Sequence, residues 1–109
     1  MSTAAVEVPQ HLRALERAND IRLRRAAYKQ KIKNGERSAL GLILQTPWWA
    51  QTMTVYEVLR SQERWGRART RKFLAPLAVH ESRELGRLTK RQRDAIADAM
   101  AEKRKAARR

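Results

Sequence analysis

The sequence of 109 residues contains no cysteine, only two histidines and few aromatic residues, which make up 6% of the chain. Without cysteine the chain has no disulfide, no thiolate chemistry and no cysteine-based zinc site. The histidines, His11 and His80, lie on distant segments. Acidic residues alternate with basic ones at helical spacing, which is typical of surface ion pairs. No glycine-rich loop has the spacing of a phosphate-binding loop or a dinucleotide fold. We therefore expect no enzyme activity, no metal, no cofactor and no small-molecule substrate.

Long apolar runs are also missing. The longest apolar stretch, residues 40–44, is far too short to cross a bilayer, and the N-terminus lacks an apolar run of signal-peptide length. We expect a soluble, cytoplasmic protein with no membrane partner.

Negative charge is scarce, because 25 lysine and arginine residues face 11 acidic ones and give a formal net charge of +14. A chain this short supports one small domain, and so large a charge on it costs self-repulsion. A polyanion would relieve the repulsion, and nucleic acid is the most common polyanionic partner of basic proteins.

The apolar spacing predicts an all-α fold, because no alternating β pattern of useful length is present. Residues 1–8 are expected to be disordered, residues 9–34 to form a long basic helix, residues 36–101 a compact multi-helix domain, and residues 102–109 a basic tail. Within the long helix the larger apolar residues Leu12, Leu15, Ile21, Tyr28 and Ile32 predict one amphipathic face.

Local signals predict where the shorter helices begin and end. Asn34 and Gly35 suit the end of the long helix, and Ser38 can cap the next one. Thr54 with Glu57, and Thr89 with Gln92, have capping-box spacing. Pro76 should end a helix near Ala75.

The three tryptophans are predicted to be mainly structural. Trp65 is expected in the core beside the turn at Gly66, because a buried indole stabilises a small core strongly. Trp48 and Trp49 are adjacent, so one helix cannot bury both, and one of them should be half exposed beneath the long helix.

Basic residues gather between positions 60 and 93, near two turns that contain Gly66 and Gly86. Turns between helices offer free backbone N–H groups and helix N-termini, which bind phosphate. Acidic residues are scarce around these turns, so solvated ion pairs explain this region poorly. The pattern indicates a nucleic-acid-binding surface.

From Met53 to Ile96 the chain resembles the actinobacterial type of integration host factor, a nucleoid-associated protein built on a helix-two-turn-helix (H2TH) module. The similarity is carried most specifically by the turn at Arg64–Arg67 and by the run Arg91, Gln92 and Arg93. Other matching positions are Met53, Val55, Leu59, Leu77, Val79, Arg83, Leu85 and Leu88. Glu84 and Gly86 stand where further basic residues are usual in that family.

The resemblance implies a protein that binds duplex DNA through its backbone and minor groove, with weak sequence preference, and that bends or compacts it. It also implies a nucleoid location, a role in integration, recombination and chromosome organisation, and recombinase or integrase complexes as further partners. The expected DNA-binding residues are Arg64, Gly66, Arg67, Arg69, Lys72, Ser82, Arg83, Arg87, Lys90, Arg91 and Arg93. Secondary candidates for backbone contacts are Arg22, Arg25 and Lys29.

On physical grounds we expect some of these residues to bind phosphate and others to enter a groove. The backbone around Gly66 and Arg67 opens a helix that can face a phosphate, while Arg83 and Arg87 are candidates for insertion into a groove, where arginine senses groove width. Two alternatives remain open at the level of sequence. One is an RNA-binding or ribosome-associated protein, and the other is a membrane-surface protein that uses the long basic helix.

Overall fold

The computed structural model describes residues 9–107. The all-α prediction is confirmed: a long helix α1 (Gln10–Lys33) precedes α2 (Ala39–Gln45), α3 (Val55–Arg60), α4 (Arg67–Leu74) and α5 (Lys90–Ala107). Three short 3-10 helices, η2 (Trp48–Ala50), η3 (Ala75–Leu77) and η4 (Leu85–Arg87), lie between them. Within the described range the only β pairing is an isolated bridge between Thr54 and Glu84. The expectations for residues 1–8, 108 and 109 concern positions outside the described residues.

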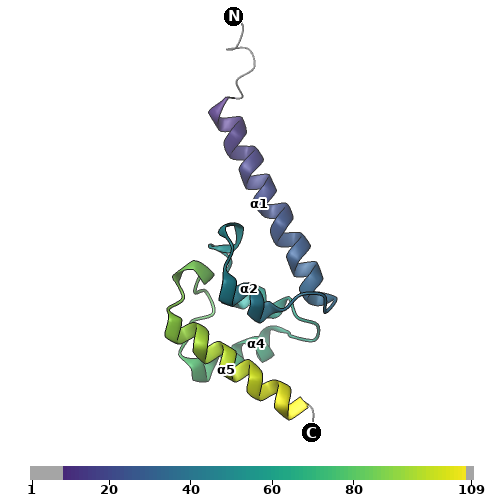
Figure 1. Cartoon of the computed structure of the whole chain (residues 1–109), viewed down its shortest axis with the longest axis vertical. Helices are drawn as coiled ribbons and strands as arrows, with labels where there is room; N and C mark the ends of the chain where they lie inside the picture. Colours follow the sequence, from purple (N-terminus) through teal and green to yellow (C-terminus); the bar gives the residue numbers. More distant parts are fainter. Residues whose placement is uncertain (1–8, 108–109) are drawn as a thin grey trace, which may run out of the picture.

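The core lies where α2, α3, α4 and α5 meet, below the projecting half of α1 (Figure 1). Its fully buried side chains come from segments far apart in sequence. The largest apolar ones are Leu42, Ile43, Met53, Val55, Val58, Leu59, Leu85 and Ile96. A core assembled in this way fixes the loops between the helices, which carry most of the predicted site.

Several predicted helix signals are confirmed. Ser38 accepts a hydrogen bond from the Gly41 N–H at 2.9 Å, and the Thr89 capping box is reciprocal with Gln92, at 3.0 and 3.1 Å. Gly35 follows the end of α1 with φ of 79°, a conformation that glycine adopts without strain. Helix α4 stops at Leu74, and Pro76 lies in the 3-10 turn that follows. Helix α5 continues to Ala107, so much of the predicted tail is helical.

The prediction of one amphipathic face along α1 is wrong. Ile32 is buried and Tyr28 packs against the core, whereas Leu12 and Leu15 are 42% and 63% exposed. The reason is helical geometry: Ile21 follows Leu12 by nine residues, which places it about half a turn round the helix. Leu12 and Leu15 therefore point away from the side that docks on the core, whereas the partly buried Ile21 lies on that side.

The base of α1 is fixed to the loop that contains η2. Arg25 Nε donates to the Trp49 carbonyl at 2.8 Å, and Tyr28 packs against Trp49 with ring centroids 5.6 Å apart. Trp48 is 51% exposed, and the guanidinium groups of Arg17 and Arg24 lie over its ring. The expectation that one of the two adjacent tryptophans is half exposed is thus confirmed.

Candidate nucleic-acid interface

The turn between α3 and α4 presents an uncapped helix N-terminus. Gly66 is the N-cap of α4, no side chain among the described residues caps the helix, and nothing lies within 4 Å of a Cβ placed on Gly66. Arg64 has φ of 68°, the left-handed conformation, which reverses the chain just before Trp65. The first N–H groups of α4 can therefore donate to an anion.

Trp65 anchors this turn to the core, as expected. Its ring meets Phe73 edge-on, with centroids 5.3 Å apart, and it packs against the core cluster while remaining partly exposed. The aromatic pair holds the start of α4 against its own last turn, and this contact gives the turn at Gly66 a defined position.

Helix α4 divides its basic residues between two sides. Arg71 faces the loop that follows η3, where it donates to both carboxylate oxygens of Glu81 at 2.7 and 3.2 Å. Arg67, one turn earlier, lies on the same side. Arg69 instead lies over the Trp65 ring, 4.7 Å from its centroid, and Lys72 borders a groove against α5. The structure thus separates residues that the sequence grouped together.

Electrostatics confirm that α4 and the loop are close. The hydrogen bond from Arg71 holds the pKa of Glu81 below its ordinary value, and the charges of Arg71 and Arg67 act in the same direction. The same hydrogen bond raises the pKa of Arg71. Glu81 is therefore a carboxylate at neutral pH, and it offsets part of the positive charge at this point of the surface.

The loop at residues 80–86 is held in place by backbone hydrogen bonds to the segment before and within α3. Val55 N–H donates to the Arg83 carbonyl at 2.9 Å, and Tyr56 N–H donates to the Glu81 carbonyl at 3.1 Å. Gly86 N–H donates to the Gln51 carbonyl at 2.9 Å. A Cβ at Gly86 would overlap the flexible Gln51 side-chain amide and would lie 3.1 Å from the Gln51 carbonyl oxygen, so glycine favours the close approach of the two segments.

Within this loop the predicted contact residues differ in whether their side chains already have a hydrogen-bond or ion-pair partner. Arg83 is exposed and forms no ion pair within the described part of the chain. Arg87 forms an exposed ion pair with Glu84 at 3.2 Å. Exposed ion pairs contribute little to stability, so a phosphate can take the place of Glu84 as the partner of Arg87. The Ser82 N–H and hydroxyl both lie close to His80 Nδ1, at 3.1 and 2.6 Å.

The start of α5 also offers basic side chains, with one exception. Arg91 is exposed, and the exposed Lys90 pairs with Asp94 at 2.9 Å, a hydrogen bond that raises the pKa of Lys90. Arg93 points into the protein, where its guanidinium donates to the Ile43 and Leu85 carbonyls and to Thr46 Oγ1. Its prediction as a DNA ligand does not fit this geometry, because its donors already satisfy buried acceptors.

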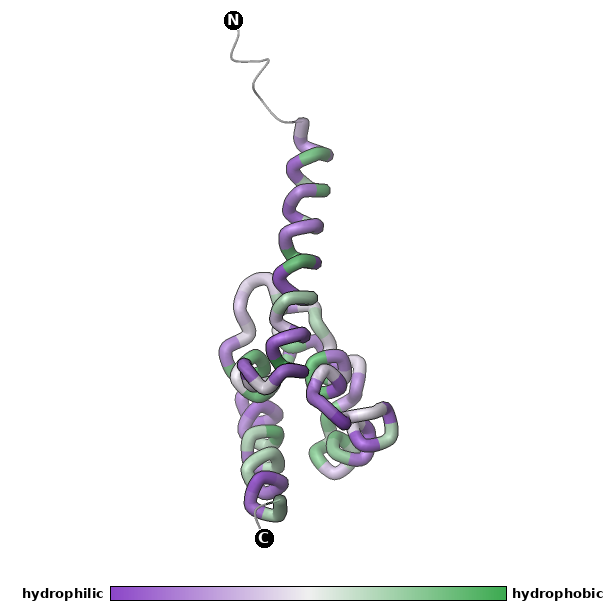
Figure 2. The backbone as a smooth tube through the Cα atoms, turned by 90° about the vertical axis from the view of Figure 1, so that its right-hand side faces the viewer, coloured by the Kyte–Doolittle hydropathy of each residue, from purple (hydrophilic) through white to green (hydrophobic). Residues whose placement is uncertain are grey.

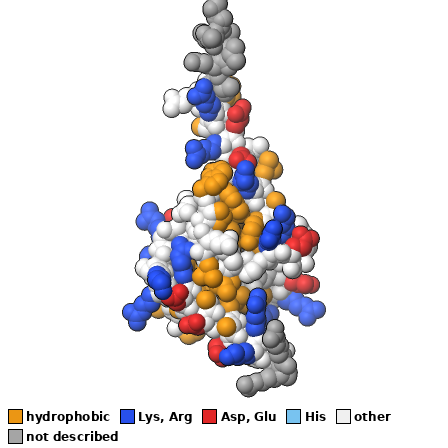
Figure 3. Space-filling model, in the orientation of Figure 1, with side chains coloured by type: hydrophobic (Ala, Val, Ile, Leu, Met, Phe, Trp, Pro, Cys, Tyr) orange, Lys and Arg blue, Asp and Glu red, His pale blue; other side chains and the backbone are white. Residues whose placement is uncertain are grey.

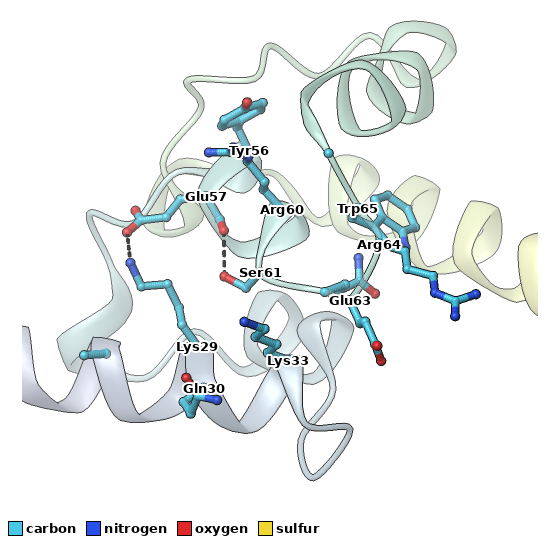
Figure 4. Close-up of a pocket in the computed structure, with 13 residues that line it drawn as sticks. Lys29, Gln30, Lys33, Tyr56, Glu57, Arg60, Ser61, Glu63, Arg64 and Trp65 are labelled. Carbon is cyan, nitrogen blue, oxygen red and sulfur yellow. Dashed lines mark hydrogen bonds and ion pairs between the residues drawn. The ribbon is translucent and has the colours of Figure 1, made fainter.

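The secondary candidates on α1 are largely engaged with the core as well. Arg25 donates to the Trp49 carbonyl and, at 2.5 Å, to Thr52 Oγ1. Lys29 pairs with Glu57 at 2.9 Å across a groove between α1 and α3 (Figure 4). Arg22 is exposed. The basic residues Arg25 and Lys29 therefore dock α1 on the domain.

Three residues that the sequence did not single out border the same surface. Arg71 lies beside Arg67, and Tyr56 is close enough to influence Arg71 electrostatically. Arg60 lies next to Tyr56 on α3 (Figure 4). Their spacing, one helical turn apart along α3 and α4, was the available signal. We call the set Tyr56, Arg60, Arg67, Arg71 and Arg83 the α3–α4 face.

The charge is spread over the molecule as well as gathered at these turns. Figure 3 shows lysine and arginine side chains around the rim of one side, with hydrophobic side chains exposed between them. Among the described residues no group of histidine and acidic side chains could hold a metal ion. No helix within residues 9–107 is both long and apolar enough to cross a membrane.

Comparison with known proteins identifies one relevant structure. No protein-family model and no curated protein matches the chain. The chain is similar to a solved structure described as sIHF, an integration host factor, bound to an 8bp palindromic DNA. The TM-score is 0.68 and the sequence identity 28%, over 80% of this chain and 97% of the other. In fold and across nearly the whole length of that protein, the chain is thus similar to an integration host factor.

Proposed function

We propose that this protein is an architectural DNA-binding protein that binds duplex DNA with weak sequence preference. The observation that carries the proposal is its similarity to sIHF over 97% of a chain whose structure was solved with DNA. The net charge of +14 supports the same class of partner. The proposal extends to an H2TH-type arrangement, in which the two turns around Gly66 and Gly86 face the nucleic acid.

The proposed contacts begin at the uncapped start of α4. Its free N–H groups donate to one phosphate, and the absence of a side chain at Gly66 lets the DNA backbone approach closely. Arg67 neutralises an adjacent phosphate from one side of α4, where Arg71 is paired with Glu81. Such contacts position a protein on duplex DNA without reading its sequence.

Arg83 is the proposed groove residue. It is exposed, it has no ion-pair partner among residues 9–107, and its backbone is fixed by the Val55 N–H. An arginine in the minor groove responds to groove width more than to base identity, which gives weak preference for narrow A·T-rich segments. Ser82, Arg87, Lys90 and Arg91 flank this position and extend the proposed backbone contacts.

Bending or compaction of the duplex follows if the two turns hold phosphates on both sides of the groove. A protein fixed at two backbone positions imposes its own spacing on the DNA, and flexible base steps accommodate the change. This action would suit integration, recombination and chromosome organisation in the nucleoid, with recombinase or integrase complexes as partners.

A salt titration tests the proposal. With about six phosphates contacted, the logarithm of the association constant should fall against the logarithm of salt concentration with a slope of about −5. Arg67→Ala should reduce affinity for every duplex alike and lower the magnitude of the slope by about 1. Arg37→Ala, which removes another exposed arginine from the loop after α1, is the matched control.

Gel-shift titration at several salt concentrations provides the measurement. A slope near zero, or equal losses for Arg67→Ala and Arg37→Ala, would contradict the proposed contacts. Duplex RNA of the same sequence should compete poorly, because A-form geometry changes the spacing of phosphates across the groove. Preferential binding of the RNA would instead favour the RNA-associated alternative.

A further inference from the structure

Helix α1 carries a largely exposed apolar stripe that begins in its projecting half. Leu12, Leu15 and Leu23 are 42%, 63% and 60% exposed. They lie on one side of the helix, because spacings of three and eleven residues correspond to about one and three turns. Figure 2 shows hydrophobic positions recurring along one side of this helix above the globule. Leu12 and Leu15 lie one turn apart and Leu23 about two turns further on, and solvated leucines gathered on one side of a helix are typical of a binding surface.

The other end of the molecule has an apolar groove. It lies between α4 with η3 on one wall and α5 on the other, and its volume is about 690 Å³. Phe73, Pro76, Leu77 and Ala99 contribute apolar surface to it. Grooves of this kind, formed between helices, bind the apolar side of an amphipathic helix.

The two features are complementary in charge. Three basic residues, Arg69, Lys72 and Lys103, border the groove beside a single acidic residue, Glu102, so its rim carries a net positive charge. None of the three basic residues forms an ion pair with another described residue. One flank of the leucine stripe carries Glu16 and Asp20, and the ion pair of Asp20 with Arg24 is exposed and easily exchanged.

We infer that the groove between α4 and α5 binds the projecting half of α1 from a second copy of this chain. In Figure 1 the start of α1 and the α4–α5 pair lie at opposite ends of the molecule. One copy can therefore bind a partner with its helix and another with its groove. A contact between two different surfaces does not close on itself, so it produces linear assemblies.

Duplex DNA promotes this assembly, a step that rests on the proposed function. Two free copies, each with a net charge of +14, repel one another, and one helix in one groove is a small contact. DNA offsets the repulsion and concentrates the copies. The groove lies on the side of α4 that carries Arg69 and Lys72, whereas Arg67 and Arg71 lie towards the loop at residues 80–83. Both surfaces can be occupied at once.

Cysteine cross-linking tests the geometry directly, because the natural chain contains no cysteine. The double variant Leu15→Cys/Pro76→Cys, oxidised on long duplex DNA, should form a ladder of disulfide-linked oligomers. The control Leu44→Cys/Pro76→Cys places one thiol at another exposed leucine, in α2, and should form no ladder. Absence of a ladder, or an equal ladder in the control, would overturn the inference.

Charge-matched variants test whether the self-association contributes to cooperative DNA binding. Leu15→Glu and Lys103→Glu should each weaken cooperative binding to long DNA about tenfold, the loss expected when one buried leucine contact is removed. Leu44→Glu and Lys31→Glu make the same changes at exposed positions outside both surfaces and should retain cooperativity. A mixture of the Leu15→Glu and Lys103→Glu variants should form pairs but no longer chains.

A short duplex separates the two proposals. On an 8-bp duplex Leu15→Glu and Lys103→Glu should bind like their charge-matched controls, because such a short duplex cannot accommodate neighbouring copies. Failure of the unaltered protein to bind this duplex would refute the proposed function. Normal binding to it, together with unchanged cooperativity of the Leu15→Glu and Lys103→Glu variants on long DNA, would refute the self-association alone.

Discussion

At the scale of single residues, arginine side chains of this chain either face solvent or form hydrogen bonds inside the protein, and Arg93 does the second. Its guanidinium satisfies the carbonyls of Ile43 and Leu85 and the hydroxyl of Thr46. Helix α2 ends at Gln45, so the Ile43 carbonyl has no acceptor role within that helix. One side chain thus joins the end of α2, the start of α5 and the start of η4.

Replacing Arg93 should therefore affect folding before it affects binding. Arg93→Met keeps much of the side-chain volume but removes three hydrogen bonds from a charged donor, and the free energy of unfolding should fall by about 2–4 kcal/mol. Arg91→Met, two residues earlier and exposed, should change it by less than about 0.5 kcal/mol. Urea denaturation followed by circular dichroism measures both values. Equal stability of the two variants would contradict the structural role of Arg93.

At the scale of elements, α4 and the loop that follows η3 are joined through Arg71 and Glu81. The pKa of Glu81 is lowered by this contact, so the stabilisation is present above the ordinary pKa of a glutamate. It is lost as the pH falls through the lower pKa of the folded state. The contact therefore matters throughout the neutral range, where the proposed DNA partner is bound.

Glu81→Gln should strengthen DNA binding. The change removes one negative charge from the α3–α4 face and frees Arg71 for a phosphate, so affinity should rise several-fold at low salt and the salt dependence should steepen. Below the ordinary pKa of glutamate the unaltered protein loses stability as Glu81 becomes protonated. The Glu81→Gln variant should lose less stability over the same pH range, because it has no carboxylate at this position. Glu36→Gln, in the loop after α1, is the control for charge. Equal gains in both variants would show that only net charge matters.

At the scale of the whole molecule, the excess of positive charge acts against the compact state. The net charge of +14 is carried by one small domain and an extended helix, and the described residues form only five ion pairs. Repulsion between like charges is relieved by salt and, more strongly, by a bound polyanion.

The melting temperature should consequently rise with ionic strength and rise further with duplex DNA. At a DNA concentration about 100 times the dissociation constant, binding to the folded state adds about 2.7 kcal/mol of stability. Differential scanning calorimetry in increasing salt, with and without a short duplex, measures both effects. A melting temperature that falls with moderate salt would indicate that attractive ion pairs dominate instead.

The sequence by itself determined the helices and the class of partner to expect. Helix ends depend on neighbours in the chain, and Ser38, Thr89 with Gln92, and Pro76 act within a few residues of the boundary they set. Net charge is a sum over composition, so it needs no structure. The similarity to integration host factors agrees with both.

Only the tertiary structure decided which basic side chains are free. Arg93 meets acceptors that lie 47 and 50 residues away in sequence, and Arg25 meets a carbonyl 24 residues away. Periodicity and local spacing contain no information on such pairs, because they form when separate helices pack. The same packing placed Arg67 and Arg71 on one side of α4, put Arg69 and Lys72 on the other, and left the leucines of α1 in solvent.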